Sequence, residues 1–340
     1  MAPPLAARIP ELGRAAMRAR WVPAALFSSG IVAGDTPILV RDFVRSALYD
    51  PNHGYFSKRM GPVGMLESSI RFNQLEGRSA YMQHLDKLYK KHDIAWFTPV
   101  ELFKPWYAYA IAASILRTAN LSVPLKIYEI GGGSGTCAKC ILDYMMLNAP
   151  PKVYNDMKYI SVEISSSLAE KQLETVGEVR SHLSKFTVEH RDATNRPGWG
   201  RKDPRPCWVL MLEQLMDTLH QALPSMSLIA SDFSYLPDVT IAGDRAPLVS
   251  SKGDADIFFP TDFQLLEQID HNCSGFSKEQ KNPGAFKPVK KRRTIILDSA
   301  AFMEEFGMPM KTKTKDGYNP LLDDFKNTKF YLSVPTHNRK

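Results

Sequence analysis

Short apolar runs alternate with segments of helical length through the middle of the chain. The runs cover residues 125–130, 159–164, 185–189, 207–212 and 226–231. Helical patterns occupy the intervals at 136–147, 167–182 and 214–223. Continuous apolar runs separated by helices indicate parallel strands that are buried on both faces. We therefore predict an α/β fold, doubly wound around a mostly parallel sheet.

The regions on either side of these strands show other patterns. Before the first strand, residues 80–92 and 101–119 carry helical periodicity. After the fifth strand the chain becomes irregular, and we expect residues 274–293 to form a solvated loop that ends in a basic run. Strands are predicted again at 294–298 and 329–334, where they would complete the sheet.

Composition narrows the class of protein. Of 340 residues 44% are hydrophobic, enough for a folded core, and no stretch reaches the roughly 18 to 20 consecutive apolar residues of a membrane span. The net charge is +7, but four arginines lie within the first 20 residues. The remainder is only mildly basic, so a nucleic-acid partner is not expected. Cys137 and Cys140 form a C-x-x-C pair with no second ligand pair nearby, so we expect no metal site.

The first thirty residues are rich in arginine and poor in acids. Arg8, Arg14, Arg18 and Arg20 accompany a single acid, Glu11. This composition is typical of a mitochondrial transit peptide, which we predict for residues 1–30. A disordered basic tail is the alternative interpretation.

A glycine-rich motif follows the first predicted strand. Gly131, Gly132, Gly133 and Gly135 stand between that strand and a helix that we expect to start near Thr136. Glycine lets the backbone turn sharply and approach a ligand closely because it has no Cβ atom. The N-terminus of the helix would present unpaired N–H groups to that ligand. The order of strand, glycine loop and helix therefore predicts a ligand site.

The residues around the glycines indicate the class of ligand. A dinucleotide site requires G-x-G-x-x-G, and Thr136 stands in place of the third glycine; a P-loop requires Gly-Lys-Ser/Thr, which is absent. Glu129 precedes Gly131 by two residues, where it would repel a pyrophosphate and attract a sulfonium or an amino group. S-adenosyl-L-methionine carries both positive groups and no phosphate, so we predict it as the cofactor.

Two further acids follow the next two strands. Glu163 ends the second predicted strand, where a carboxylate can accept hydrogen bonds from ribose hydroxyls. Asp192 follows the third strand and is placed to accept from an adenine amino group. Parallel strands bring their carboxyl ends to one edge of the sheet. The predicted cofactor-binding residues are Glu129, Gly131, Gly133, Gly135, Glu163 and Asp192.

Four segments match, in order, the motifs of a known family. They are Pro51, Gly54, Tyr55 and Phe56 for a P-x-x-G-Y-Y signature; Thr98, Pro99 and Glu101, loosely, for T-S-P-E; Glu129 to Thr136 for E-[LI]-G-x-G-x-G-T; and Val162 to Ser165 for V-E-[VI]-S. On these motifs the chain resembles the MidA-like family of S-adenosylmethionine-dependent methyltransferases, which includes a mitochondrial complex I assembly factor.

The resemblance implies a class I methyltransferase fold, which is Rossmann-like, with a helical extension at the N-terminus. Residues 31–120 would form that helical region and cap the substrate, 121–235 would bind the cofactor, and 236–340 would complete the sheet. The implied activity is methylation of an arginine in a complex I subunit, within the mitochondrial matrix.

Catalysis on arginine sets its own requirement. The guanidinium group stays protonated because its pKa exceeds about 12, so carboxylates that orient it and polarise its charge are the natural catalytic groups. The catalytic candidates are Glu213, after the fourth strand, and Glu101.

The chain departs from the family on the substrate side. Leu212 replaces an Asn before Glu213, and Ile94-Ala95 replaces a Gly-Asp pair. Only about 13 residues separate Glu213 from Ser227, near the minimum of about a dozen for a parallel crossover. Part of the expected substrate wall is therefore missing. Two alternatives stay open: a cofactor-binding scaffold without turnover, and a methyltransferase that acts on RNA or a small molecule.

Overall fold

The computed structural model describes residues 39–50, 54–55, 63–91, 97–211, 215–236, 260–276 and 292–336. Within these ranges seven strands form one sheet. They are β1 (Lys126–Ile130), β2 (Lys158–Glu163), β3 (Phe186–His190), β4 (Cys207–Met211), β5 (Met226–Phe233), β6 (Arg292–Asp298) and β7 (Thr328–Pro335). Every strand expected from the sequence is present, with bounds that differ by at most two residues.

The order of the strands creates a crevice for a ligand. The sheet runs β3-β2-β1-β4-β5-β7-β6. β1 to β5 pair in parallel, and β7 is antiparallel to both of its neighbours. The predicted doubly wound, mostly parallel sheet is confirmed. The chain order reverses between β1 and β4, and open α/β sheets bind ligands outside the carboxyl ends of the strands at such a point.

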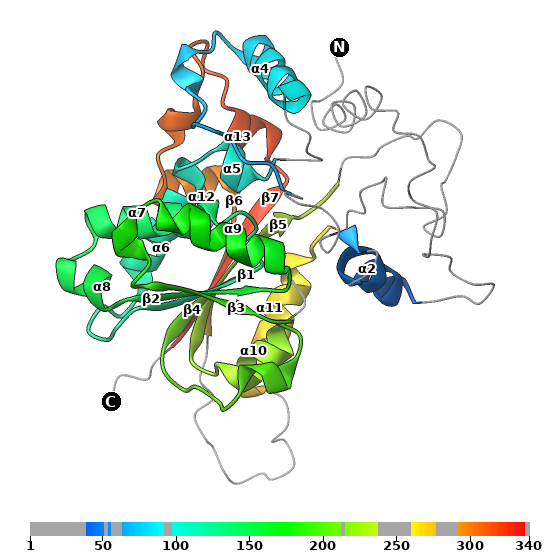
Figure 1. Cartoon of the computed structure of the whole chain (residues 1–340), viewed down its shortest axis with the longest axis vertical. Coiled ribbons are helices and arrows are strands. Elements are labelled where there is room, and N and C mark those ends of the chain that lie inside the picture. The colour runs from blue at the N-terminus through cyan, green and yellow to red at the C-terminus, as the bar shows by residue number, and fades with distance from the viewer. Residues whose placement is uncertain are drawn as a thin grey trace.

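Helices cover both faces of the sheet. They are α4 (Arg78–Lys91), α5 (Pro99–Leu102), α6 (Trp106–Thr118), α7 (Thr136–Asn148), α8 (Pro151–Asp156), α9 (Ser166–Gly177), α10 (Met216–Ala222), α11 (Phe263–His271), α12 (Ser299–Phe306) and α13 (Pro320–Asp324). Figure 1 shows α6 to α9 and α12 on one side of the strands, and α10 and α11 on the other. A further helix, α2 (Val40–Tyr49), lies beside the sheet.

Burial on both faces explains the continuous apolar runs of the strands. Successive side chains of a strand point to opposite faces of the sheet. In β1, Ile127 belongs to the core beneath α6 and α7, whereas Tyr128 belongs to the core beneath α10 and α11. Each strand between the two layers must therefore be apolar at nearly every position.

The helical predictions differ from the structure in detail. The helix expected over 101–119 is two helices, α5 and α6, because Pro105 between them has no N–H group for a helical hydrogen bond. The crossover between β4 and β5 contains α10, so the short connection does close. Helices α8, α11, α12 and α13 were not predicted from the sequence; each is short, from five to nine residues. None of the helices in the described ranges has the length and apolar composition of a membrane span.

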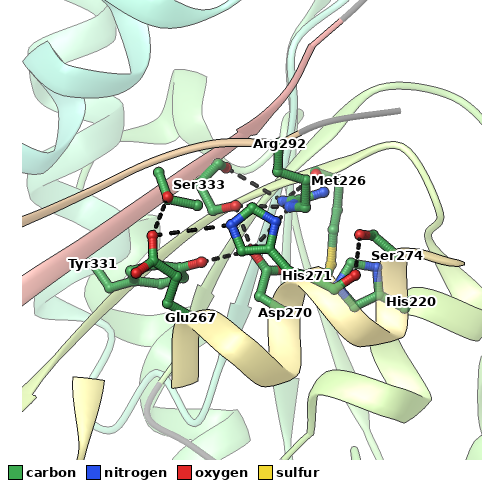
Figure 2. Close-up of polar contacts among 10 residues, drawn as sticks. His220, Met226, Glu267, Asp270, His271, Ser274, Arg292, Tyr331 and Ser333 are labelled. Carbon is green, nitrogen blue, oxygen red and sulfur yellow. Dashed lines mark hydrogen bonds and ion pairs between the residues drawn. The ribbon is translucent and has the colours of Figure 1, made fainter. Parts of the chain in front are cut away.

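A network of buried polar side chains ties α11 to the far strands of the sheet. Asp270, near the end of α11, is fully buried. Its Oδ1 atom lies 2.7 Å from Nε2 of His220 in α10. Its Oδ2 atom accepts hydrogen bonds from Nε of Arg292 at 2.9 Å and from the Tyr331 hydroxyl at 2.7 Å. The Ser333 hydroxyl donates to the same oxygen, and Figure 2 shows these side chains converging on Asp270.

Arg292 corrects part of the sequence analysis. The basic run before the sixth strand was expected to lie in a solvated loop, but Arg292 is the first residue of β6 and is only 6% exposed. Its Nη2 atom donates to the carbonyl oxygen of Met226 at 3.0 Å. Residues 274–276 belong to a helical turn that follows α11, and residues 277–291 lie outside the described residues. Apolar periodicity could not indicate this burial, since it depends on Asp270 as a partner.

We expect Asp270→Asn to lower the free energy of unfolding by about 3 to 5 kcal/mol, because Arg292 would remain buried without an opposite charge. Burial alone would raise the pKa of Asp270, but the hydrogen bond from His220 and the charge of Arg292 hold this pKa at about 2. Urea denaturation would measure the loss. The exposed Asp217→Asn variant is the control and should change the value by less than about 0.5 kcal/mol; equal losses in the two variants would contradict the prediction.

Candidate functional site

The glycine loop joins β1 to α7 at the point where the strand order reverses. Gly131, Gly133 and Gly135 have φ angles of +71°, +54° and +84°. Residues with a Cβ atom rarely adopt this left-handed region, so the turn depends on glycine at all three positions. Gly135 is the N-cap residue of α7, and the loop therefore leads directly into the N-terminus of that helix.

The space around these glycines differs between the two sides of the loop. A Cβ atom added at Gly131 or Gly133 would meet no atom within 4 Å, so these positions face open space. A Cβ atom at Gly135 would lie 2.8 Å from Cα of Gln172, because α9 packs closely against the loop. The loop thus has an open face at Gly131 and Gly133 and a supported face at Gly135.

Glu129 lies buried beneath the loop, with 7% of its surface exposed. The Tyr159 hydroxyl donates to its Oε2 atom at 3.0 Å, and the Cys137 thiol also hydrogen-bonds the carboxyl group. Burial raises the pKa of Glu129 to about 7, although these two hydrogen bonds oppose the rise. The groups that hydrogen-bond Glu129 are neutral, and the nearby Glu163 carboxyl also raises its pKa. A cation brought beside Glu129 would therefore favour the ionised carboxylate.

The cysteine pair at the start of α7 has a structural role. Cys137 and Cys140 are both buried, and burial raises the pKa of the Cys137 thiol well above its ordinary value. Reactive cysteines are exposed thiolates with a low pKa, so this pair lacks the properties of a redox motif. Among the described residues no group of three or more His, Cys, Asp or Glu side chains could hold a metal ion.

Gln172 connects the loop to the second predicted acid. Its Nε2 atom donates to the carbonyl oxygen of Gly133 at 3.1 Å and to Oε2 of Glu163 at 3.0 Å. The backbone N–H of Ser165 donates to the other oxygen of Glu163 at 3.0 Å, and burial raises the pKa of Glu163. Gln172 was not predicted as a site residue from the sequence. Its spacing of four residues from Leu168, on the buried side of α9, is the signal that could have found it.

Two buried polar atoms beside the loop indicate that the site fits a polar ligand. Oγ of Ser161 and Oε1 of Gln172 have no hydrogen-bond partner among the described residues. Buried polar atoms are nearly always paired, and exceptions call for an explanation. The open glycines, the two carboxyl groups and these atoms together suit a ligand that carries positive groups and hydroxyls. The residues present therefore fit S-adenosylmethionine.

Asp192 lies just beyond the end of β3, at the same edge of the sheet. Its Oδ1 atom accepts from the backbone N–H of Thr194 at 2.8 Å and from the Thr194 hydroxyl at 2.6 Å. Its Oδ2 atom lies 3.0 Å from Nη2 of Arg45 in α2. The pairing with Arg45 was not anticipated, because a contact across 147 residues leaves no trace in local sequence patterns.

The two predicted catalytic acids have different outcomes. Glu101 is fully buried; its Oε1 atom accepts from the backbone N–H of Leu66 at 2.6 Å and from Nζ of Lys104 at 2.5 Å. Its Oε2 atom accepts from the hydroxyl of Thr136, the first residue of α7, at 2.6 Å. These contacts give Glu101 a positioning role behind the glycine loop, and its catalytic role stays a prediction. Glu213 lies outside the described residues.

A comparison with protein families gives one match. Residues 110–219 match the family described as "Putative S-adenosyl-L-methionine-dependent methyltransferase". The matched segment runs from α6 to α10 and includes the glycine loop, Glu129, Glu163 and Asp192. No curated protein matches the chain.

Solved structures show a similar fold. A COG1565 superfamily member from Burkholderia thailandensis, bound to S-adenosyl-homocysteine, has a TM-score of 0.56 and 12% sequence identity over 98% of this chain and 94% of that one. A native structure of a COG1565 superfamily protein from the same organism has a TM-score of 0.52 and 11% sequence identity, and again covers 98% of this chain and 94% of that one. At these identities the likeness supports the fold. The family match supports a methyltransferase that uses S-adenosylmethionine as its cofactor, and the fold is consistent with this.

We expect cofactor affinity to depend on the protonation of Glu129. Because its pKa is about 7 in the free protein, the ionised fraction falls about tenfold between pH 8 and pH 6. A cationic ligand requires the ionised form, so affinity should fall by about the same factor and binding near pH 7 should release a proton. Calorimetric titration with S-adenosylmethionine, in buffers of different ionisation enthalpy, measures both effects.

Glu129→Gln is the matched control for this titration. It keeps the size of the side chain but cannot ionise. The variant should bind S-adenosylmethionine more weakly than the wild type, and its affinity should lack the pH dependence that comes from Glu129. The amino group of the ligand titrates in the same way for both proteins and cancels in the ratio of their affinities. A ratio that stays constant from pH 6 to pH 8 would contradict the assignment of Glu129 to the cofactor's positive groups.

Proposed function

We propose that this protein transfers a methyl group from S-adenosylmethionine to an arginine side chain of a protein, a subunit of mitochondrial complex I, in the mitochondrial matrix. The observation that carries the proposal is the glycine loop, in which Gly131 and Gly133 have positive φ and face open space, next to the buried carboxyl groups of Glu129 and Glu163. The choice of acceptor and compartment is supported by the MidA-like motifs and by the arginine-rich residues 1–30, which lie outside the described residues.

The residues of the site would hold the cofactor by its polar groups. Glu129 would face a positive group, Glu163 the ribose hydroxyls, and Asp192 the adenine amino group. Gln172 keeps Glu163 and the carbonyl of Gly133 in fixed positions, so the loop and the acid move as one unit. The cofactor supplies a methyl group that its sulfonium activates for transfer. Positioning of the two reactants supplies most of the rate in such a displacement.

On the acceptor side, carboxylates must orient a guanidinium that remains charged. Glu213 is the candidate for this role. Glu101 would act indirectly, since both of its oxygens already accept hydrogen bonds from Leu66, Lys104 and Thr136. That arrangement also favours the second candidate function, a cofactor-binding scaffold without turnover, because one of the two predicted catalytic acids is committed to holding the loop.

Gly133→Val tests the cofactor site. Valine is strained at a φ of +54°, so the variant should distort the loop and lose binding of S-adenosyl-homocysteine, measured by calorimetry. Gly200→Val is the matched control, because Gly200 has a φ of +63° and a Cβ atom there would also meet nothing within 4 Å. Gly200 has a ψ of −140°, which lies close to a region that is nearly exclusive to glycine, so its variant should lose at least about 1 to 3 kcal/mol of unfolding free energy and still bind. Binding of wild-type strength by Gly133→Val would remove the glycine loop as the cofactor site.

Glu213→Gln tests catalysis. We expect loss of methyl transfer to complex I subunits, followed with radiolabelled S-adenosylmethionine and identification of the modified arginine, while affinity for S-adenosyl-homocysteine is kept. Glu304→Gln, at an exposed position of α12, should keep full activity. Wild-type turnover in the Glu213 variant would refute its role. A wild-type protein that binds the cofactor and labels no subunit would support the scaffold function instead.

A further inference from the structure

An ion pair joins α2 to the predicted adenine end of the site. Nη2 of Arg45 lies 3.0 Å from Oδ2 of Asp192, and 71% and 26% of the two side chains are exposed. In the same helix Phe43, two residues before Arg45, is only 4% exposed. Helix α2 therefore lies near the carboxyl end of β3, apart from the helices that cover the two faces of the sheet (Figure 1).

The neighbouring arginine does not take this role. Arg191 precedes Asp192 directly, but its Nε and Nη2 atoms donate to Oε2 of Glu189 at 2.9 and 2.7 Å. Its guanidinium also lies 4.0 Å from the ring centroid of Trp199. The charge of Arg191 is thus committed to other groups, and Arg45 supplies the cation that Asp192 contacts.

The hydrogen bonds of Asp192 leave one acceptor position open. A carboxylate offers about four lone-pair positions. The two on Oδ1 are taken by the N–H and the hydroxyl of Thr194, and one on Oδ2 is taken by Arg45. The two hydrogen bonds from Thr194 to Oδ1 hold the local turn without Arg45. The contact from Arg45 instead fixes Oδ2, the oxygen that still has a free acceptor position.

We propose that Arg45 is a positioning residue of the adenine subsite. It holds Oδ2 of Asp192 so that the remaining lone pair accepts from the 6-amino group of adenine, and it makes α2 part of the wall around that end of the cofactor. The proposal rests on the proposed use of S-adenosylmethionine. The opposite arrangement, in which Arg45 competes with adenine for Asp192, predicts effects of opposite sign.

Titration of the full chain with S-adenosyl-homocysteine tests the proposal. Arg45→Ala should weaken binding roughly two- to fivefold, as expected for an exposed pair, through faster dissociation in stopped-flow measurements. The same substitution in an Asp192→Asn background should cause little further loss, because the two residues act together. Arg117→Ala removes another exposed ion pair, with Glu305, and should leave binding unchanged.

A second ligand separates positioning from a general structural role. S-inosyl-homocysteine has a carbonyl group in place of the 6-amino group, so its 6-position accepts hydrogen bonds and would face the Asp192 carboxylate as a second acceptor. The wild-type chain should prefer the adenosyl ligand, and Arg45→Ala should reduce that preference. Unchanged or tighter binding by Arg45→Ala, or an unchanged preference between the two ligands, would overturn the proposal. Failure of the wild-type chain to bind S-adenosyl-homocysteine would instead refute the proposed function.

Discussion

The left-handed backbone of the turn between β1 and α7 is the constraint on which the rest of the site depends. A chain that leaves a buried strand and enters a helix within five residues must turn sharply, and here it does so through three residues with positive φ. The N–H of Gly135 donates to the carbonyl oxygen of Gly132 within the turn at 3.0 Å, and the turn also depends on support from its surroundings. Gln172 holds it from α9 through the carbonyl of Gly133, and Glu101 holds the start of α7 through Thr136.

Three buried acids among the described residues differ in their electrostatics. Asp270 has the charged partner Arg292, and its pKa is lowered. Glu129 and Glu163 are hydrogen-bonded by neutral groups, and burial raises the pKa of each. A buried carboxyl group with a charged internal partner is complete within the fold, whereas one with neutral partners gains stability when a positive ligand arrives. The difference therefore distinguishes Asp270 from the two acids that we predict to bind the cofactor.

The sequence predicted the strands and the loop because their signals are local. A strand buried on both faces is apolar throughout, and a turn with positive φ requires glycine, so both features are visible in short windows. Contacts that join distant segments are not visible in this way. Gln172, Arg292 and Arg45 are polar residues whose roles come from partners 39, 22 and 147 residues away. The hydrogen bond between Glu101 and Thr136 was not anticipated for the same reason, since the two residues lie on different helices.

The proposed cofactor site and the Asp270 network lie at opposite ends of the parallel strands, and this separation has a physical reason. At the Asp270 end each charge has an internal partner, so the charges add rigidity there without needing a ligand. At the carboxyl ends of the strands, Glu129 and Glu163 are buried, and their hydrogen-bond partners among the described residues are neutral. Burial of a carboxyl group without a cationic hydrogen-bond partner lowers the free energy of unfolding in the absence of a ligand. Helix α2 meets the carboxyl ends through Asp192, the most exposed of the predicted acids among the described residues. The Asp192 side chain is 26% exposed and already accepts hydrogen bonds from Thr194, so an exposed arginine can orient it with little loss of solvation. Pairing an arginine with a fully buried acid would cost far more solvation.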